Sequence, residues 1–262
     1  MKAKIIISGI IVLLSLISLT AFKVRSRSQK EQIEQLQNAP DKGSIAWYAR
    51  LAKAKGEREI VTPMMVISCG FTVENLDEAL SSLGAVVAQP IKKKSYITST
   101  MPLESYNEIR NWVKDDQIHT WYKFRILENL LGKPIPVCQY CDDPDFDWEK
   151  LIPEEMLPVN KDEFMIETDG GTVEIDGVKV TQNGGFMKYS GSERYLLFLT
   201  TNASGKIAGV GMGASGVYTI SPENRLVPVS KQNERFIQDI TGLYGSSLDS
   251  LKTYIWNHPS AK

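Results

Sequence analysis

The feature that most constrains this chain is an apolar run near its N-terminus. Residues 5–22 read IIISGIIVLLSLISLTAF, eighteen residues without a charge. A helix needs roughly 20 residues to cross the hydrocarbon core of a bilayer, so this run is at the lower limit of what can span one. An ordinary buried helix is the alternative, but such helices rarely lack charges on every face. The run therefore predicts a transmembrane helix that holds the protein in the membrane. We expect the rest of the chain to form the folded part.

The fate of this run leaves two interpretations open. Lys2 and Lys4 precede it, as in the basic segment of a signal peptide. Bulky Leu19 stands two residues before Ala21, which is a poor cleavage sequence, so we favour an uncleaved anchor over a cleaved signal. The basic residues after the run would favour a cytoplasmic flank. We nevertheless expect export, which predicts a single-pass cell-membrane protein with most of its chain extracytoplasmic, or a secreted protein if the signal is cleaved.

The overall composition argues against a nucleic-acid partner. Apolar residues make up 42% of the chain and charged residues 23%, as in folded proteins with a buried core. The formal net charge is -1, whereas dedicated nucleic-acid-binding proteins are usually strongly basic. We therefore expect no nucleic-acid partner.

The order of predicted elements indicates the fold class. Strand-like segments follow one another through the middle of the chain, and helical patterns lie mostly towards its ends, at residues 45–57, 72–84, 102–116, 233–245 and 247–259. Asp176-Gly177 stands between alternating apolar residues, which is the strongest short signal for a hairpin. Residues 194–201 are apolar on both faces, which predicts a central strand.

Consecutive strands without intervening helices favour an antiparallel sheet, and closure into a small barrel would remove its edges. We therefore predict a mainly β fold with accessory helices (α+β), built on a small antiparallel OB-like β-barrel with an N-terminal transmembrane helix. The predicted parts are a signal anchor or signal peptide with a basic flank (1–30), a stalk with a helical segment (31–84), the barrel (85–230) and C-terminal helices (231–262).

A glycine-rich segment matches the dinucleotide-binding pattern G-x-G-x-x-G at Gly211, Gly213 and Gly216. That pattern binds pyrophosphate only when a strand leads in and a helix begins after it. Here VYTISP follows, a β-like segment that ends at Pro222. We therefore predict a glycine-rich bend in a hairpin, where missing side chains permit close backbone packing, and no nucleotide cofactor.

The three cysteines offer the next candidate chemistry. Cys138 and Cys141 form C-x-x-C, and aspartates follow directly, whose charge opposes thiolate formation. We favour a disulfide or structural pair, and zinc binding, redox activity and unpaired thiols stay open as alternatives. Cys69 lies in an apolar run and predicts a buried thiol. His119 and His258 lack a nucleophile motif, so we predict no catalytic residue, no metal ligand and no cofactor.

A weaker candidate is a ligand-binding face on one strand. In residues 118–126 the side chains alternate, so Trp121, Lys123 and Arg125 share one face, and Lys92, Lys93 and Lys94 form a basic run on another strand. Aromatic and basic faces of this kind bind oligonucleotides or sugars in OB-type barrels. The alternative is an ordinary wet sheet face, with Trp121 covered by a terminal helix.

Three stretches carry a resemblance to a known group. AVVAQPIKKKSYI, IHTWYKFRILENLLGK and GSERYLLFLTTNASGKIAGVGMGASGVYTI resemble uncharacterised bacterial exported proteins, which share I-x-T-x-Y-x-F-x-[IV] in an early strand and Tyr-Leu-Leu-Phe-Leu before a glycine-rich hairpin. The strand order is loosely similar to the OB-like barrel of netrin and tissue-inhibitor-of-metalloproteinase modules. The resemblance covers roughly residues 85–221 and implies fold and export, without catalytic residues. The N-terminal cysteine of the inhibitor modules has no equivalent here.

These observations predict a membrane-anchored extracytoplasmic protein that binds or scaffolds an envelope protein or glycan without catalysis. One alternative is a thiol oxidoreductase or metal-dependent enzyme that uses Cys138 and Cys141. Another is a protein-interaction module that acts through the helices at residues 232–257.

Overall fold

The computed structural model describes residues 27–62, 73, 75–98, 117–138, 148–184, 187–211, 213–230, 234–243 and 246–258. The chain divides into two compact units, residues 1–62 with 173–181, and residues 63–172 with 182–262. The sequence-based boundary at residue 85 differs from this division, and the hairpin around residue 176, which we placed in the barrel, belongs to the first unit. The apolar run at 5–22 lies outside the described residues, as does the helix predicted at 102–116. No helix in the described part is long and apolar enough to cross a membrane.

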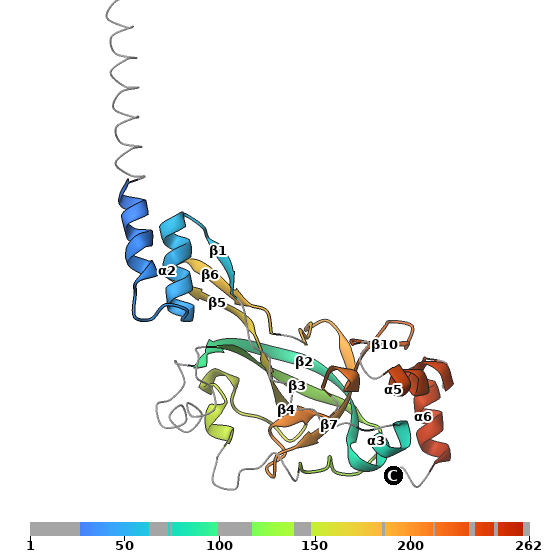
Figure 1. Cartoon of the computed structure of the whole chain (residues 1–262). Helices are drawn as coiled ribbons and strands as arrows, with labels where there is room; N and C mark the ends of the chain where they lie inside the picture. Colours follow the sequence, from blue (N-terminus) through green and yellow to red (C-terminus); the bar gives the residue numbers. More distant parts are fainter. Residues whose placement is uncertain are drawn as a thin grey trace, which may run out of the picture. The chain divides into compact units, whose positions relative to one another are not determined.

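The first unit combines helices with a small sheet (Figure 1). Residues 27–37 are helical, and α2 spans Ile45–Lys55, as the sequence predicted. The Ser44 hydroxyl oxygen accepts the Trp47 N–H at 3.0 Å and caps the start of α2, whereas Gly56 ends the helix in the left-handed region at φ 78°. The Trp47 indole N–H donates to the Leu36 carbonyl at 2.7 Å and ties the two helical segments together.

The sheet of this unit contains the predicted hairpin. Strands β5 (Gly171–Ile175) and β6 (Val178–Gln182) are joined by Asp176 and Gly177, at φ 51° and 78°, so both turn residues take the positive φ that the Asp-Gly signal predicts. The third strand, β1 (Glu59–Thr62), pairs with β6, which gives the order β1-β6-β5. The pairing joins segments far apart in the sequence.

The second unit is built on a seven-stranded sheet. The order is β10-β9-β7-β2-β3-β4, with β8 paired to β7, and the pairs between these strands are antiparallel. The strands are β2 (Gly84–Ile97), β3 (Ile118–Asn129), β4 (Glu163–Asp169), β7 (Arg194–Thr201), β8 (Ala208–Val210), β9 (Val217–Ile220) and β10 (Leu226–Pro228). The register of β2 on β3 shifts between Val87 and Ala88 and again between Pro90 and Lys92, as expected where a proline interrupts the hydrogen-bond ladder. The mixed α+β class, with mostly sheet and accessory helices, is confirmed.

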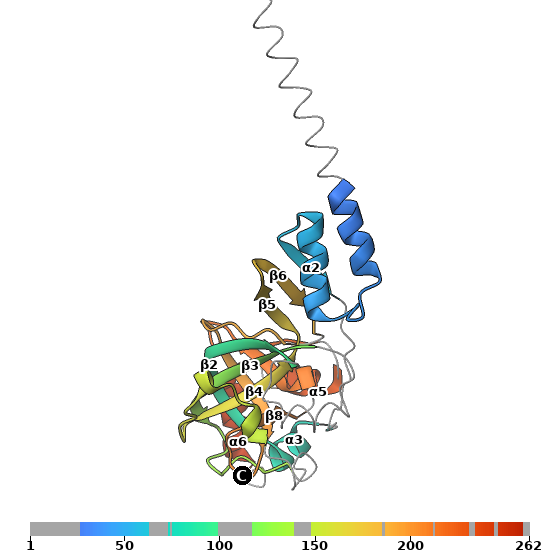
Figure 2. The ribbon, with the colours of Figure 1, turned by 90° about the vertical axis from the view of Figure 1, so that its left-hand side faces the viewer.

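The predicted closure into a barrel is wrong. β4 lies beside β8 in the ribbon (Figure 2). Among the described residues, β4 meets the segment before β8 at one isolated parallel bridge, where the Met165 N–H donates to the Lys206 carbonyl at 2.7 Å. β8 has only three residues, and they pair with Leu199–Thr201 of β7. The other half of that edge, Arg194–Leu197, pairs with β9 and leads outward to β10. The edge of β7 that a barrel would need is thus divided between two short strands.

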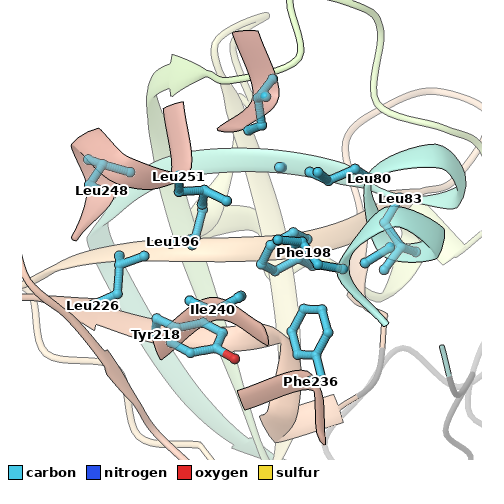
Figure 3. Close-up of a cluster of buried hydrophobic side chains, with 14 of the residues drawn as sticks. Leu80, Leu83, Leu196, Phe198, Tyr218, Leu226, Phe236, Ile240, Leu248 and Leu251 are labelled. Carbon is cyan, nitrogen blue, oxygen red and sulfur yellow. The ribbon is translucent and has the colours of Figure 1, made fainter. Parts of the chain in front are cut away.

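Apolar cores lie on the two faces of the sheet. On one face, α3 (Leu76–Ser82), α5 (Glu234–Gln238), the π-helical turn Asp239–Leu243 and α6 (Leu248–Asn257) pack on β2, β7 and β9 (Figure 3). The other face holds an aromatic core, Tyr122, Phe124, Phe164, Tyr189 and Tyr195 among others. β7 is buried on both faces between these cores, which confirms it as a central strand.

The helices of this unit correct two details of the sequence reading. α3 begins at Leu76 with Asn75 as its cap, whose side-chain oxygen accepts the Glu78 N–H at 2.9 Å. It ends at Ser82, and Gly84, the last residue of the predicted range 72–84, already starts β2. Residue 72, where the predicted range 72–84 begins, lies outside the described residues. The C-terminal helices are present, but Phe236, Leu251 and other apolar side chains of theirs belong to the main core. They are therefore part of the domain and not a separable module.

Candidate functional site

The predicted ligand face lies on the outer side of β2 and β3. Trp121, Lys123 and Arg125 share one face of β3, as the alternation predicted, and the register places Lys92 opposite Lys123 and Lys94 opposite Trp121. The basic run and the aromatic strand are therefore neighbours in the sheet, which the sequence alone did not show.

Two of the three candidates on this face are buried. Trp121 is 1% exposed and Lys123 is 7% exposed, whereas the Arg125 side chain is 53% exposed. The cover is residues 148–160, here called the strap, which contain the 3-10 turns Trp148–Leu151 and Glu154–Met156. Ile152 and Met156 pack in one apolar cluster with Trp121. A loop from the middle of the chain therefore covers Trp121, rather than a terminal helix.

The strap meets the basic residues with acceptors of its own. The Lys92 ammonium donates to the Glu155 carbonyl, and the Lys94 ammonium lies 2.8 Å from the Glu155 carboxylate. The hydrogen bond from Lys94 holds the pKa of Glu155 below its usual range. Lys123 donates to the Pro158 carbonyl at 2.7 Å. Each lysine is thus occupied by a group of the strap.

A buried carboxylate fixes the end of the strap. Glu163 is 5% exposed and lies 3.7 Å from both Lys123 Nζ and Arg125 Nη2. Burial raises its pKa, but the Asn160 backbone N–H and side-chain amide, at 3.1 and 2.9 Å, together with both cations, lower the pKa below its ordinary value. Glu163 is therefore the buried counter-ion of Lys123, which makes Lys123 a structural residue in this state.

A second polar cluster was missed by sequence reasoning. His119 Nδ1 lies 3.3 Å from Glu167 Oε1 and 3.5 Å from Asp169 Oδ1, and its ring stacks on Tyr96. The Tyr96 hydroxyl donates to Glu167, and burial, followed by the charge of Glu167, raises the pKa of Tyr96. The groups come from β2, β3 and β4, so only the strand pairing brings them together. The alternation of residues 118–126 placed His119 on the correct face but could not supply its carboxylates.

The described residues contain no group of three or more His, Cys, Asp or Glu side chains arranged to hold a metal ion. The His119 cluster instead cross-links three strands next to the end of β4. There the Thr120 hydroxyl donates to the Gly170 carbonyl at 2.7 Å, and the Ile118 N–H donates to Gln182 Oε1 at 2.6 Å. Within the cluster, the stacking of Tyr96 on His119 and the hydrogen bond from Tyr96 to Glu167 likewise join β2, β3 and β4.

The structure describes one residue of the predicted cysteine pair, Cys138. Cys138 is disulfide-bonded, and its N–H donates to the Thr201 carbonyl at 2.9 Å, next to the bridge between Val137 and Thr201. Cys141 lies outside the described residues, so the pairing of Cys138 with Cys141 stays a prediction. Cys69 also lies outside them.

The glycine-rich segment has the context of a bend. Gly213–Gly216 form a 3-10 turn, and β9 begins directly after it, so no helix N-terminus faces a phosphate there. A Cβ on Gly211 would lie 2.6 Å from Leu83 Cδ2, and one on Gly216 would lie 2.7 Å from the Gly211 carbonyl oxygen. The predicted close packing is confirmed at Gly211 and Gly216, whereas Gly213 has open space around it and takes a positive φ of 54°. The predicted hairpin is wrong, because β8 and β9 pair with successive parts of β7 and not with each other.

Fold and site together define a class: a two-unit α+β protein whose larger unit carries a basic and aromatic sheet face covered by its own chain. Comparison with known proteins found no matching family model, curated protein or solved structure. The resemblance to bacterial exported proteins therefore stays a prediction.

Proposed function

We propose that this chain is a membrane-anchored extracytoplasmic protein, held by residues 5–22, that binds an envelope protein or glycan without catalysis. The observation that carries the location is the disulfide at Cys138. Disulfides persist in oxidising compartments outside the cytoplasm, which agrees with export directed by the apolar run.

The position of Cys138 supports a structural disulfide. Its backbone is bonded to Thr201 at the end of β7, so the disulfide adjoins the central strand of the core. The face of β2 and β3 supports a role in ligand binding, because lysines and an aromatic side chain gather there as they do on ligand-binding sheets.

Protease accessibility tests the location. The full chain with a C-terminal tag is expressed in bacterial cells whose outer permeability barrier has been removed. Added protease should digest the tag while the inner membrane is intact. A tag that resists digestion until that membrane is lysed would place the folded part in the cytoplasm and overturn the proposal.

The thiol-enzyme alternative is separated by replacing both cysteines of the pair with serine. An oxidoreductase predicts that wild-type protein reduces insulin disulfides and that the Cys138→Ser/Cys141→Ser variant does not. A structural disulfide predicts no such activity in either protein and a lower unfolding midpoint in the variant. Insulin reduction that disappears with the cysteines would replace our proposal with the enzymatic one.

A further inference from the structure

Three lysines gather on one part of the sheet. Lys92 stands directly opposite Lys123, and Lys94 is two residues further along β2. Like charges that face each other across neighbouring strands destabilise a sheet, so such a group needs anions or other acceptors. In this structure the strap supplies them, through the Glu155 carboxylate and the carbonyls of Glu155 and Pro158.

The strap is held by side-chain contacts at β2 and β3, and at its end by Asn160, whose backbone N–H and side-chain amide donate to Glu163 of β4. Its contacts with β2 and β3 include the lysine side chains and the apolar cluster that Ile152 and Met156 form with Trp121, against which Tyr96 and Val159 also pack. At its start, Glu149 pairs with Lys206 at 2.5 Å. The Lys94–Glu155 and Lys206–Glu149 ion pairs are partly exposed, so they are weak singly and are screened by salt.

The chemistry beneath the strap suits an acidic sugar. Trp121 offers a broad apolar ring, which is 1% exposed beneath the strap. The lysines supply charge for carboxylates. Arg125 extends the basic surface beyond the strap, since its side chain is 53% exposed.

We propose that the strap is an internal occupant of an anion-binding face, and that a carboxylated glycan binds this face by displacing it. Glu155 occupies the place of a glycan carboxylate, and Met156 shields the ring on which a sugar would pack. The inference rests on the proposed binding function and adds to it a site, a ligand class and an autoinhibitory contact.

The test measures binding of fluorescently labelled oligogalacturonate to the full chain in detergent micelles, by anisotropy at low salt. Glu149→Gln with Glu155→Gln removes both strap ion pairs and should tighten binding by about two- to thirtyfold, the range expected for losing two partly exposed pairs. Lys92→Gln with Lys94→Gln should weaken binding. Glu128→Gln is the matched control, because Glu128 pairs with Lys252 at 2.6 Å away from the strap, and it should bind as wild type does.

Circular dichroism first establishes that each variant is folded. The inference is overturned if the Glu149/Glu155 variant binds no more tightly than wild type, or if the Lys92/Lys94 variant binds equally well. Equal binding of a neutral oligosaccharide, or of polyglutamate, overturns the acidic-glycan assignment in favour of a neutral sugar or an acidic peptide. Absence of oligogalacturonate binding in every variant also overturns the inference. The proposed location is tested separately, by whether added protease digests the C-terminal tag.

Discussion

Replacing Lys123 with methionine tests whether this lysine is part of a buried ion pair. The change removes the cation 3.7 Å from Glu163 and the donor 2.7 Å from the Pro158 carbonyl, while it keeps most of the apolar stem. Breaking a buried pair by removing one partner costs about 3–5 kcal/mol, because the remaining charge is left uncompensated. Glu163 retains Asn160 and Arg125, so we expect the lower end, about 3 kcal/mol.

The assay is thermal or urea unfolding of the full chain in detergent micelles, followed by circular dichroism. A loss of about 3 kcal/mol corresponds to a fall of roughly 6–12 °C in the unfolding midpoint of the larger unit. Because the chain has two units, their transitions are analysed separately.

Two variants make the test specific. Arg125→Met removes a cation at the same 3.7 Å from Glu163, but from a side chain that is 53% exposed, and should cost about 1 kcal/mol or less. Lys123→Met with Glu163→Gln removes both buried charges and should recover most of the loss. Equal losses for Lys123→Met and Arg125→Met, or no recovery in the double variant, would refute the buried-pair reasoning.

Three further predictions concern pH and packing. Stability should fall as pH rises above about 10, because burial raises the pKa of five tyrosines in the folded state above their value in the unfolded chain. An unfolding midpoint that is flat to pH 11.5 would contradict this. These tyrosines are Tyr96, Tyr122, Tyr189, Tyr195 (to about 12) and Tyr218. The pKa of Glu163 is lower in the folded protein than in the unfolded chain, so its ionised form contributes stability that is lost as pH falls through the folded pKa. Unfolding midpoints measured from pH 6 to 3 should therefore fall less steeply in Glu163→Gln than in wild type. Equal slopes would count against this prediction. Gly211→Ala should cost about 1–3 kcal/mol in urea unfolding, because its Cβ would overlap buried Leu83. Gly209→Ala, with open space around the added Cβ, is the control and should cost less. Equal costs for the two variants would show that the overlap with Leu83 relaxes freely.

Local patterns account for the parts of the fold that were predicted correctly. The Asp176-Gly177 turn, the helix at Ile45–Lys55 and the central strand Arg194–Thr201 depend on turn chemistry, capping and periodicity within a few residues. The alternation of Trp121, Lys123 and Arg125 was correct for the same reason, since strand geometry fixes which side chains share a face.

Their exposure could not be predicted in this way. A polar alternation shows that two faces differ, but it does not show what covers each face. The strap lies more than twenty residues along the chain from Trp121 and has no periodic pattern of its own. The prediction of a closed barrel was wrong for a similar reason, because closure depends on which short strand pairs with which half of β7.

Propensities and spacings along the chain predict most of the described helices and strands, their order, and the charge and aromatic character of the β2–β3 face. Contacts between distant segments appear in the folded structure alone: β1 joins the distant hairpin, His119 meets Glu167 and Asp169, and the strap covers Trp121 and Lys123. Those contacts join segments far apart in the sequence, and they form because burying apolar side chains and pairing buried charges favour one arrangement of the whole unit.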